Sequence, residues 1–239
     1  MPMRVFATIP TFNESENIGP LIAEIRRLQR PIGIVVADDD SPDGTWRQVE
    51  RIAASDSDVY LLRRTRNKGR GLAGAEAFQF ALDRGADVVL EMDADFSHDP
   101  ALIPQFLAKI REVDLVIGSR HLAQSKDARG SLARRWLTQF SSFYARTVLS
   151  LPVRDCNSGY RCFRREVLER IGMDTVISTG PSIVQELLYR AHLEGFTIGE
   201  IPIVFKDRQA GESQLNFKRL LKGFLMVPRL RAMHLLGKI

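Results

Sequence analysis

Two carboxylates that stand one residue apart, Asp93 and Asp95, are the residues of this chain best suited to chemistry. They lie in LEMDADFSHDP (residues 90–100), at the end of an apolar run that is typical of a buried strand. On an extended segment this spacing points both side chains to the same side. Two anions so close repel each other, and a hard cation such as Mg²⁺ or Mn²⁺ would relieve the repulsion. The pair therefore predicts a divalent-metal site with coordination positions left for substrate phosphates.

The residues that follow this pair have a simpler interpretation. Ser97 is typical of a helix N-cap, and Asp99 with Pro100 is typical of a first helical turn. A helix start accounts for Ser97 to Pro100 and leaves Asp93 and Asp95 unexplained. An Asp-x-Asp pair alone nevertheless occurs by chance in many chains.

A second acidic stretch, ADDDSPDGT (residues 37–45), follows another apolar run. Residues 42–44 form a typical turn, and Thr45 is suited to cap the next helix. Asp38 and Asp39 are left without a local role. An acid at such a position commonly binds a base or a ribose hydroxyl; the alternative is a solvated acidic loop.

Apolar runs alternate with helical patterns along the first half of the chain, which predicts a mostly parallel α/β sheet covered on both faces. In such a sheet, ligands bind at the carboxyl ends of the strands, where the polar clusters fall. The predicted strands are residues 4–10, 32–40, 59–63, 87–93, 114–119 and 196–205, and the predicted helices are residues 16–30, 45–54, 72–84, 100–112, 131–149 and 182–194.

Size and composition favour one catalytic domain over residues 1–215, followed by a basic segment over residues 216–239. The chain has 239 residues, of which 44% are hydrophobic. The basic segment holds six Lys or Arg and no acid, so the net charge of +5 leaves the rest at 5 − 6 = −1. We therefore expect no nucleic-acid partner. We also expect no signal peptide, no membrane-spanning helix, and free thiols at Cys156 and Cys162. The four histidines show no ligand spacing.

Six ordered stretches, which extend over essentially the whole chain, carry a family resemblance. They are IPTFNESENI (9–18), ADDDSPDGT (37–45), DADFSHDP (93–100), VIGSRH (116–121), CNSGYRCF (156–163) and DRQAGESQLN (207–216). The chain resembles family-two GT-A glycosyltransferases, and the dolichyl-phosphate or polyprenyl-phosphate mannose synthases in particular. The resemblance implies a GT-A, Rossmann-like fold, a nucleotide-sugar donor, Mg²⁺ or Mn²⁺, and a lipid-phosphate acceptor.

The same resemblance implies roles for residues at the donor site. Asp93 and Asp95 would hold the metal and the diphosphate, with Ser97 as a further metal ligand, and Arg120 and Arg208 would clamp phosphate. The donor contacts implied in full are Pro10, Phe12, Asn13, Glu14, Ala37, Asp39, Lys68, Asp93, Ala94, Asp95, Arg120, Arg208 and Gln214.

Two positions depart from the family pattern. Phe12 stands where Tyr is usual, which keeps ring stacking and loses a hydroxyl contact. Gln214 stands where many relatives carry Lys; an amide can still bond a phosphate oxygen but adds no charge. Either Lys68 or Arg208 compensates, or the donor site is weaker.

The acceptor phosphate is expected at Arg120, Arg134 and Thr138. Arg134 and Thr138 stand four residues apart on a predicted helix and therefore share a face. By position they correspond to an arginine and a serine that hold the acceptor in the family. Without the resemblance, Arg134 and Arg135 would be interpreted as a solvated surface.

The basic segment over residues 216–239 is predicted to be an amphipathic helix that Pro228 breaks or kinks. Such a helix can lie in the membrane interface, although a helix that packs on the domain has the same pattern. We expect a peripheral protein at the cytoplasmic face of the membrane, with a membrane-anchoring protein as a further partner.

The expected reaction transfers one mannose from GDP-mannose to a polyprenyl monophosphate, with inversion implied by the family. One alternative is another sugar, such as glucose from UDP-glucose, on the same carrier. The others are a non-catalytic nucleotide-sugar-binding subunit and a nucleotidyltransferase, but the latter would need an early glycine-rich loop.

Overall fold

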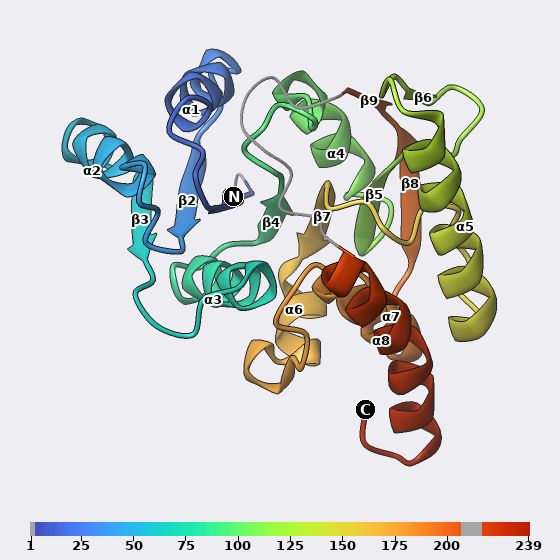
Figure 1. The fold of residues 1–239 in the computed structure, drawn as a ribbon. Coiled ribbons are helices and arrows are strands. Elements are labelled where there is room, and N and C mark those ends of the chain that lie inside the picture. The colour runs from blue at the N-terminus through green and yellow to red at the C-terminus, as the bar shows by residue number, and fades with distance from the viewer. Residues whose placement is uncertain (1–2, 207–216) are drawn as a thin grey trace.

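A sheet of seven strands in the order β3-β2-β1-β4-β7-β5-β8 forms the centre of the molecule (Figure 1). The computed structural model describes residues 3–206 and 217–239, without the side chains of Arg134 and residues 217–220. The strands are β1 Val5–Thr11, β2 Ile32–Asp38, β3 Val59–Arg63, β4 Val88–Glu91, β5 Leu115–Ser119, β7 Arg161–Arg164 and β8 Ile198–Pro202. A separate pair joins β6 Lys126–Asp127 to β9 Val204–Phe205.

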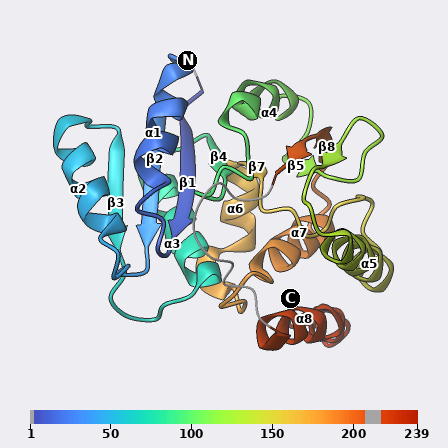
Figure 2. The same ribbon diagram turned by 45° about the horizontal axis from the view of Figure 1, so that its top comes forward.

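Helices cover both faces of this sheet (Figures 1 and 2). One face carries α1 Ile18–Arg27, α2 Thr45–Ser55, the short η1 Pro100–Leu102 and α4 Ile103–Lys109. The other carries α3 Arg70–Asp83, α5 Leu132–Leu149, α6 Arg165–Ile171, η2 Met173–Thr175, α7 Ile183–Leu193 and α8 Phe217–Leu235. A hydrophobic core lies on each side of the sheet as a result.

The apolar pattern of each element explains its place between these layers. All seven residues of β2 are buried, as a central strand covered on both faces requires. In α1 the buried residues Ile18, Leu21, Ile22 and Ile25 recur at helical spacing, so one stripe of the helix faces the sheet.

The strand directions gather the polar loops at one edge of the sheet, which we call the functional edge. β1, β2, β3 and β4 are parallel neighbours, and β5 runs parallel to β8. β7 is antiparallel to both β4 and β5, so β5 points the same way as β4. The functional edge therefore holds the carboxyl ends of all parallel strands and the loop that leads into β7.

The predicted GT-A arrangement of a mostly parallel sheet with helices on both faces is confirmed, but some local predictions are wrong. Ser97 does not cap the helix after β4; Asp99 holds that position, and its side chain accepts from the N–H of Ala101. Thr45 does not cap α2; Gly44 holds that position, and the Thr45 hydroxyl bonds Asp43 at 2.6 Å. Of the break or kink predicted at Pro228, the break is wrong, since α8 continues past it to Leu235. In the described ranges no helix is long and apolar enough to cross a bilayer.

The helix α8 packs on the domain. Val227 and Leu230 are buried in the same core as α3, α6 and α7. The ring of Phe224 stacks on Tyr144 of α5 at 5.2 Å between centroids. This packing favours treating residues 217–239 as part of the same structural unit as the sheet.

We predict that Leu230→Ala lowers the free energy of unfolding by about 2 to 5 kcal/mol, because it leaves a cavity in this core. Leu225→Ala on the same helix is the matched control; its side chain is 60% exposed, and we expect a change within about 0.5 kcal/mol. Urea denaturation measures both. Equal small effects would show that α8 is not held on the domain in solution.

Candidate active site

Three loops lie around the point between β1 and β4 at which the order of the strands in the sheet reverses. From β1 the chain continues to β2 and β3 on one side, while β4 lies on the other. Such a switch point is the usual ligand crevice of an open α/β sheet. The loops after β1, β2 and β4 carry Phe12 to Glu14, Asp39, and Asp93 with Asp95.

In the loop after β4, hydrogen bonds fix the two predicted metal ligands. Asp95 is buried, and its Oδ1 accepts from the backbone N–H of Ser97 at 3.1 Å. The backbone N–H of Asp93 donates to Nδ1 of His98 at 2.9 Å. Burial lowers the pKa of His98, so its imidazole is neutral and carries its proton on Nε2. His98 stacks on Tyr160 at 4.9 Å between centroids, which ties this loop to the one that precedes β7.

The side chain of Asp93 also pairs with an arginine that the sequence did not single out. Arg70, at the start of α3, donates to Oδ1 of Asp93 at 3.2 Å and to Oε1 of Glu91 at 2.9 Å. Burial raises the pKa of Glu91, and the Arg70 guanidinium opposes that rise. A Cβ on Gly159 would lie 2.9 Å from Nη2 of Arg70. A larger residue at this position would therefore require the Arg70 guanidinium to shift.

A second buried network holds Asp39, the predicted nucleoside ligand. Its Oδ1 accepts from Arg64, and its Oδ2 accepts from the backbone N–H of Gly69 at 2.7 Å. The Arg64 side chain is only 3% exposed and also binds Glu76 at 2.8 Å. Burial raises the pKa of Asp39, and the Gly69 and Arg64 contacts oppose this. Asp39 is thus held at the functional edge by two donors.

The neighbouring acid, Asp38, serves the backbone instead. It is fully buried and accepts from the hydroxyl of Thr11 at 2.8 Å and from the N–H and hydroxyl of Ser41 at 2.8 and 2.7 Å. The Ser41 hydroxyl in turn accepts from the N–H of Asn13 at 3.0 Å. Asp38 therefore fixes the loop after β1 relative to the loop after β2.

In that loop after β1, the predicted donor contacts lie at the surface. Phe12 is 39% exposed, and Asn13 adopts a left-handed φ of 58°. The backbone N–H of Glu14 donates to the Thr45 hydroxyl at 2.9 Å, and its carboxylate accepts from Asn17 at 2.7 Å. An exposed ring on a fixed loop beside Asp39 is suited to stack on a base.

Arg120, the predicted phosphate clamp after β5, forms a buried bidentate pair with Asp155. Its Nε and Nη2 lie 2.7 Å from the two carboxylate oxygens, and its backbone N–H binds the same carboxylate. Although burial alone would raise the pKa of Asp155, the Arg120 guanidinium holds it well below its usual range. Asp155 thus orients Arg120, and an arginine has five N–H donors, more than this pair uses.

The predicted acceptor residue Thr138 lies near Arg120 through a further arginine. Arg129 donates to the Thr138 hydroxyl at 3.1 Å and forms an ion pair with Asp127 at 2.6 Å. The guanidinium groups of Arg120 and Arg129 lie 5.1 and 5.2 Å from the ring centroid of Phe205. This places two arginines at one aromatic ring, and one of them bonds the Thr138 hydroxyl.

The remaining predicted site residues are placed as follows. Ala37 and Ala94 are buried in the two cores, Pro10 is half-buried at the end of β1, and Lys68 is exposed and paired with Asp40 at 3.3 Å. Arg208 and Gln214 lie outside the described residues, as does the side chain of Arg134. Whether Lys68 or Arg208 offsets the neutral Gln214 stays a prediction.

The site residues that the sequence did not predict are mostly the hydrogen-bond or ion-pair partners of the residues that it did predict. Arg64 and Arg70 lie in the basic run LRRTRNKGRG (residues 62–71), which follows the third strand and could have indicated counterions for the acids. Asp155 immediately precedes the CNSGYRCF stretch (156–163). The sequence gives no sign of the role of His98, because a side chain that bonds the backbone needs no ligand spacing.

The acidic pair fits a divalent cation that shares its ligands with a substrate. Asp93 and Asp95 offer hard carboxylate oxygens from residues with only Ala94 between them, beside a crevice. Among the described residues no group of three or more His, Cys, Asp or Glu side chains could hold a metal ion. Mg²⁺ and Mn²⁺ sites of this kind are completed by substrate phosphates and water.

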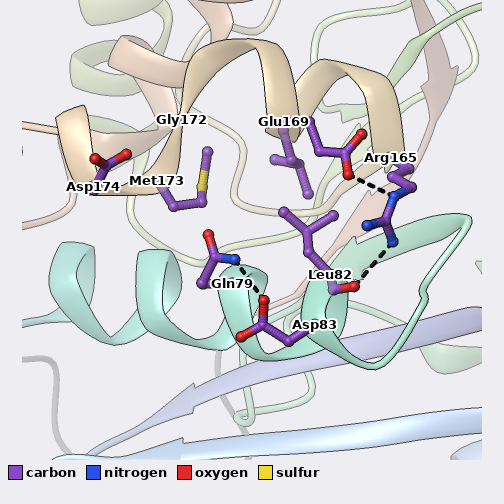
Figure 3. Close-up of a pocket in the computed structure, with 9 residues that line it drawn as sticks. Gln79, Leu82, Asp83, Arg165, Glu169, Gly172, Met173 and Asp174 are labelled. Atoms are coloured by element: carbon purple, nitrogen blue, oxygen red, sulfur yellow. Dashed lines mark hydrogen bonds and ion pairs between the residues drawn. The ribbon is translucent and has the colours of Figure 1, made fainter.

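A separate pocket lies at the opposite edge of the sheet, between α3 and the α6–η2 segment (Figure 3). Its volume is about 450 Å³. Arg165 pairs there with Glu169 at 2.7 Å, and Gln79 with Asp83 at 2.8 Å. These groups satisfy one another, and the pocket is remote from the acidic loops, so we do not assign the active site to it.

We predict that Arg64→Gln lowers the free energy of unfolding by about 3 to 5 kcal/mol, because it leaves the Asp39 carboxylate buried without its cation. Arg63→Gln is the matched control: its side chain is 42% exposed in the pair with Asp40, and we expect a loss of about 1 kcal/mol or less. Urea denaturation separates the two. Equal losses would mean that the Arg64 pair is not buried in solution.

Comparison with known proteins identifies the family. Glycosyl transferase family 2 matches residues 7–172. The undecaprenyl-phosphate mannosyltransferase of Micrococcus luteus is 37% identical over 90% of this chain and 88% of its own length. The polyprenol monophosphomannose synthase of Mycolicibacterium smegmatis is 34% identical over 94% and 85%. The dolichol-phosphate mannosyltransferase of Pyrococcus furiosus is 32% identical over 95% of this chain and 64% of its own length.

Solved structures agree on the fold. Glucosyl-3-phosphoglycerate synthase from Mycobacterium tuberculosis, in complex with Mn²⁺, UDP and glucosyl-3-phosphoglycerate, superposes with a TM-score of 0.66 at 18% identity. The match covers 96% of this chain and 78% of that one. Together, the family match, the relatives above 30% identity and the shared fold lead to one conclusion: this chain is a glycosyltransferase and belongs to glycosyl transferase family 2.

Proposed function

We propose that this chain transfers one mannose from GDP-mannose to the phosphate of a polyprenyl lipid. The observation that carries the proposal is the meeting of Asp39, Asp93 and Asp95 at the switch point, with Arg120 at the end of β5 on the same edge. The three relatives named above, each of which acts on mannose and a polyprenyl or dolichol phosphate by name, support the choice of sugar and acceptor.

The donor would lie across the carboxyl ends of β1, β2 and β4. Phe12 would stack on the base, and Asp39 would accept hydrogen bonds from the nucleoside. Asp93 and Asp95 would hold Mg²⁺ or Mn²⁺ together with the donor diphosphate. The bound ion would supply positive charge where the departing diphosphate develops negative charge.

The acceptor phosphate would approach from the side of β5 and α5. Arg120 and Arg129 offer cationic donors there, and Arg129 bonds the hydroxyl of Thr138, a residue of α5. A phosphate monoester is already anionic at neutral pH, since its second pKa is about 6. The nucleophile therefore needs little help from a base, and the residues act mainly by positioning the two substrates.

A lipid acceptor requires contact with a membrane, and α5 has a suitable surface. Leu132, Trp136, Phe140 and Phe143 recur along one side of this helix and are 57 to 72% exposed. Leu221 and Leu225 of the adjacent α8 are 48 and 60% exposed. We call these six residues the apolar face. These two neighbouring helices expose apolar side chains and also carry basic residues in their sequences. That combination is typical of a peripheral membrane protein.

The transfer itself is tested with radiolabelled GDP-mannose and UDP-glucose, each incubated with polyprenyl phosphate and Mn²⁺. We expect label from GDP-mannose in the organic extract and none without the lipid or with excess EDTA. Label from UDP-glucose alone would assign another sugar. No label from either donor would contradict the proposed function.

We predict that Asp95→Asn lowers transfer by at least about a hundredfold, because the carboxylate that binds the ion and the diphosphate is lost. Asp99→Asn in the same loop is the matched control. Its side chain accepts from the N–H of Ala101 at 2.9 Å as a helix cap, a role that Asn also fills. Calorimetry with GDP and Mn²⁺ should show weaker binding in the first variant only. Near-normal turnover by Asp95→Asn would end the metal assignment.

We predict that Leu132→Ser with Trp136→Ser lowers vesicle binding at least about tenfold at high salt, because the two exposed side chains no longer enter the bilayer. Binding by the unaltered chain should weaken but persist as salt rises, since only its electrostatic part is screened. Co-sedimentation measures the effect, and unchanged GDP affinity is the control for folding. Salt-resistant binding by the variant would place the membrane contact elsewhere.

A further inference from the structure

A second cluster of basic side chains lines a cavity on the flank of α5. The cavity has a volume of about 510 Å³. Its walls are the segment after β5, one side of α5, and the chain between α5 and β7; the lining residues are Arg120, His121, Leu122, Gln139, Phe143, Arg146 and Arg154. Gln139, Phe143 and Arg146 follow one another at i, i+4 and i+7, so they share one side of the helix.

Two arginines of this cavity differ from those at the functional edge. Arg64, Arg70 and Arg120 each pair with a carboxylate. Within residues 3–206 and 217–239, by contrast, the guanidinium groups of Arg146 and Arg154 have no ion-pair partner. Arg146 is half-buried and lies 5.8 Å from the ring centroid of Phe143, and Arg154 is exposed. Among the described residues these two arginines therefore form no ion pair of their own, although the Glu200 carboxylate accepts from the backbone N–H groups of Arg154 and Asp155 at 2.9 and 3.0 Å.

The histidine of the cavity adds an unsatisfied polar atom. In the described part of the chain, Nε2 of His121 is buried and has no hydrogen-bond partner. A buried polar nitrogen without a partner is costly, and an entering ligand that bonds it would remove that cost. Two arginines without an ion pair and one unsatisfied nitrogen, gathered around a single cavity in the described part of the chain, together indicate an anionic ligand.

This cavity is distinct from the expected place of the acceptor phosphate. Thr138 bonds Arg129 on the side of α5 that faces β6. Gln139 and its partners lie about 100° further around the helix. Arg120 contributes to the wall of the cavity, but its charge is already paired with Asp155.

The surroundings of the cavity favour a ligand that is part of a membrane. Phe143 lines the cavity and also belongs to the apolar face, on which Phe140 and Trp136 continue along α5. A ligand there would meet cations at one end and exposed aromatic rings at the other. Inorganic phosphate would leave these rings uncovered, and a base or a sugar would cover only Phe143, the one ring that lines the cavity.

We propose that this cavity binds the phosphate of an anionic bilayer phospholipid, whose acyl chains extend along the apolar face. The proposal rests on the membrane contact in the proposed function. Arg146 and Arg154 bind the phosphate oxygens, and His121 donates a further hydrogen bond. A phospholipid held on this flank orients α5 on the bilayer and leaves the Arg129–Thr138 side open to the acceptor.

The test compares vesicles of phosphatidylcholine alone with vesicles that contain phosphatidylglycerol, using the full chain. R146Q/R154Q should lower the affinity for the anionic vesicles about tenfold or more, since each basic residue near such a surface contributes about fivefold. Affinity for the neutral vesicles should stay unchanged. R30Q/R51Q is the matched control: it removes the same charge from two exposed arginines, Arg30 between α1 and β2 and Arg51 on α2, and these elements lie at the other end of the sheet from α5 (Figure 1). Equal losses in both double variants would mean that net charge alone acts, and would overturn the proposal.

Two further measurements separate this site from the acceptor site and from free anions. With a short, detergent-soluble polyprenyl phosphate and no bilayer, R146Q/R154Q should keep its acceptor KM and its GDP affinity. A rise in that KM equal to the loss of vesicle affinity would assign the cavity to the acceptor and overturn the phospholipid assignment. Submillimolar calorimetric binding of inorganic phosphate, lost in R146Q/R154Q, would assign the cavity to a free anion. Vesicle binding involves no sugar transfer, so its outcome is independent of whether the proposed reaction occurs.

Discussion

Pairing of buried carboxylates with arginines is the constraint on which the functional edge depends. A parallel sheet brings several acids together at the ends of its strands, and buried carboxylates repel one another unless a cation lies between them. Arg64 directly follows β3 and holds Asp39, and Arg70 is the first residue of α3 and joins Glu91 to Asp93. The stretch from the end of β3 to the start of α3 therefore sets the positions of acids at the ends of β2 and β4.

The other half of the functional edge, between the end of β5 and the start of β7, also depends on a carboxylate paired with an arginine. Asp155 orients Arg120 beside Phe205, so the loop before β7 positions the cation that follows β5. His98 and Tyr160 stack and join this half to the loop of Asp93 and Asp95. Donor and acceptor sides thus share one set of contacts, and the antiparallel β7 is the strand that brings them together.

The fold could be predicted from the sequence because its signals are local. Each signal is contained in a few consecutive residues, as in the apolar runs of β2 and β4 and the turn before α2. The metal site at Asp93 and Asp95 could be predicted for the same reason, because the two residues are close together in the sequence. Their counterions were not found, because Arg70 precedes Asp93 by 23 residues and Asp155 follows Arg120 by 35. Such pairs depend on tertiary contacts. The exposed rings of α5 were missed because a helical apolar stripe does not reveal whether it faces core or solvent.

A crystal structure with GDP and Mn²⁺, with the metal located by its anomalous scattering, tests the central claim most directly. The account predicts that Mn²⁺ lies within direct coordination distance of the Asp95 carboxylate and of the GDP diphosphate. It also predicts the guanosine beside Asp39 and Phe12, with the Arg64 and Arg70 pairs intact. Mn²⁺ and GDP bound together at another place, such as the pocket between α3 and α6, would contradict it.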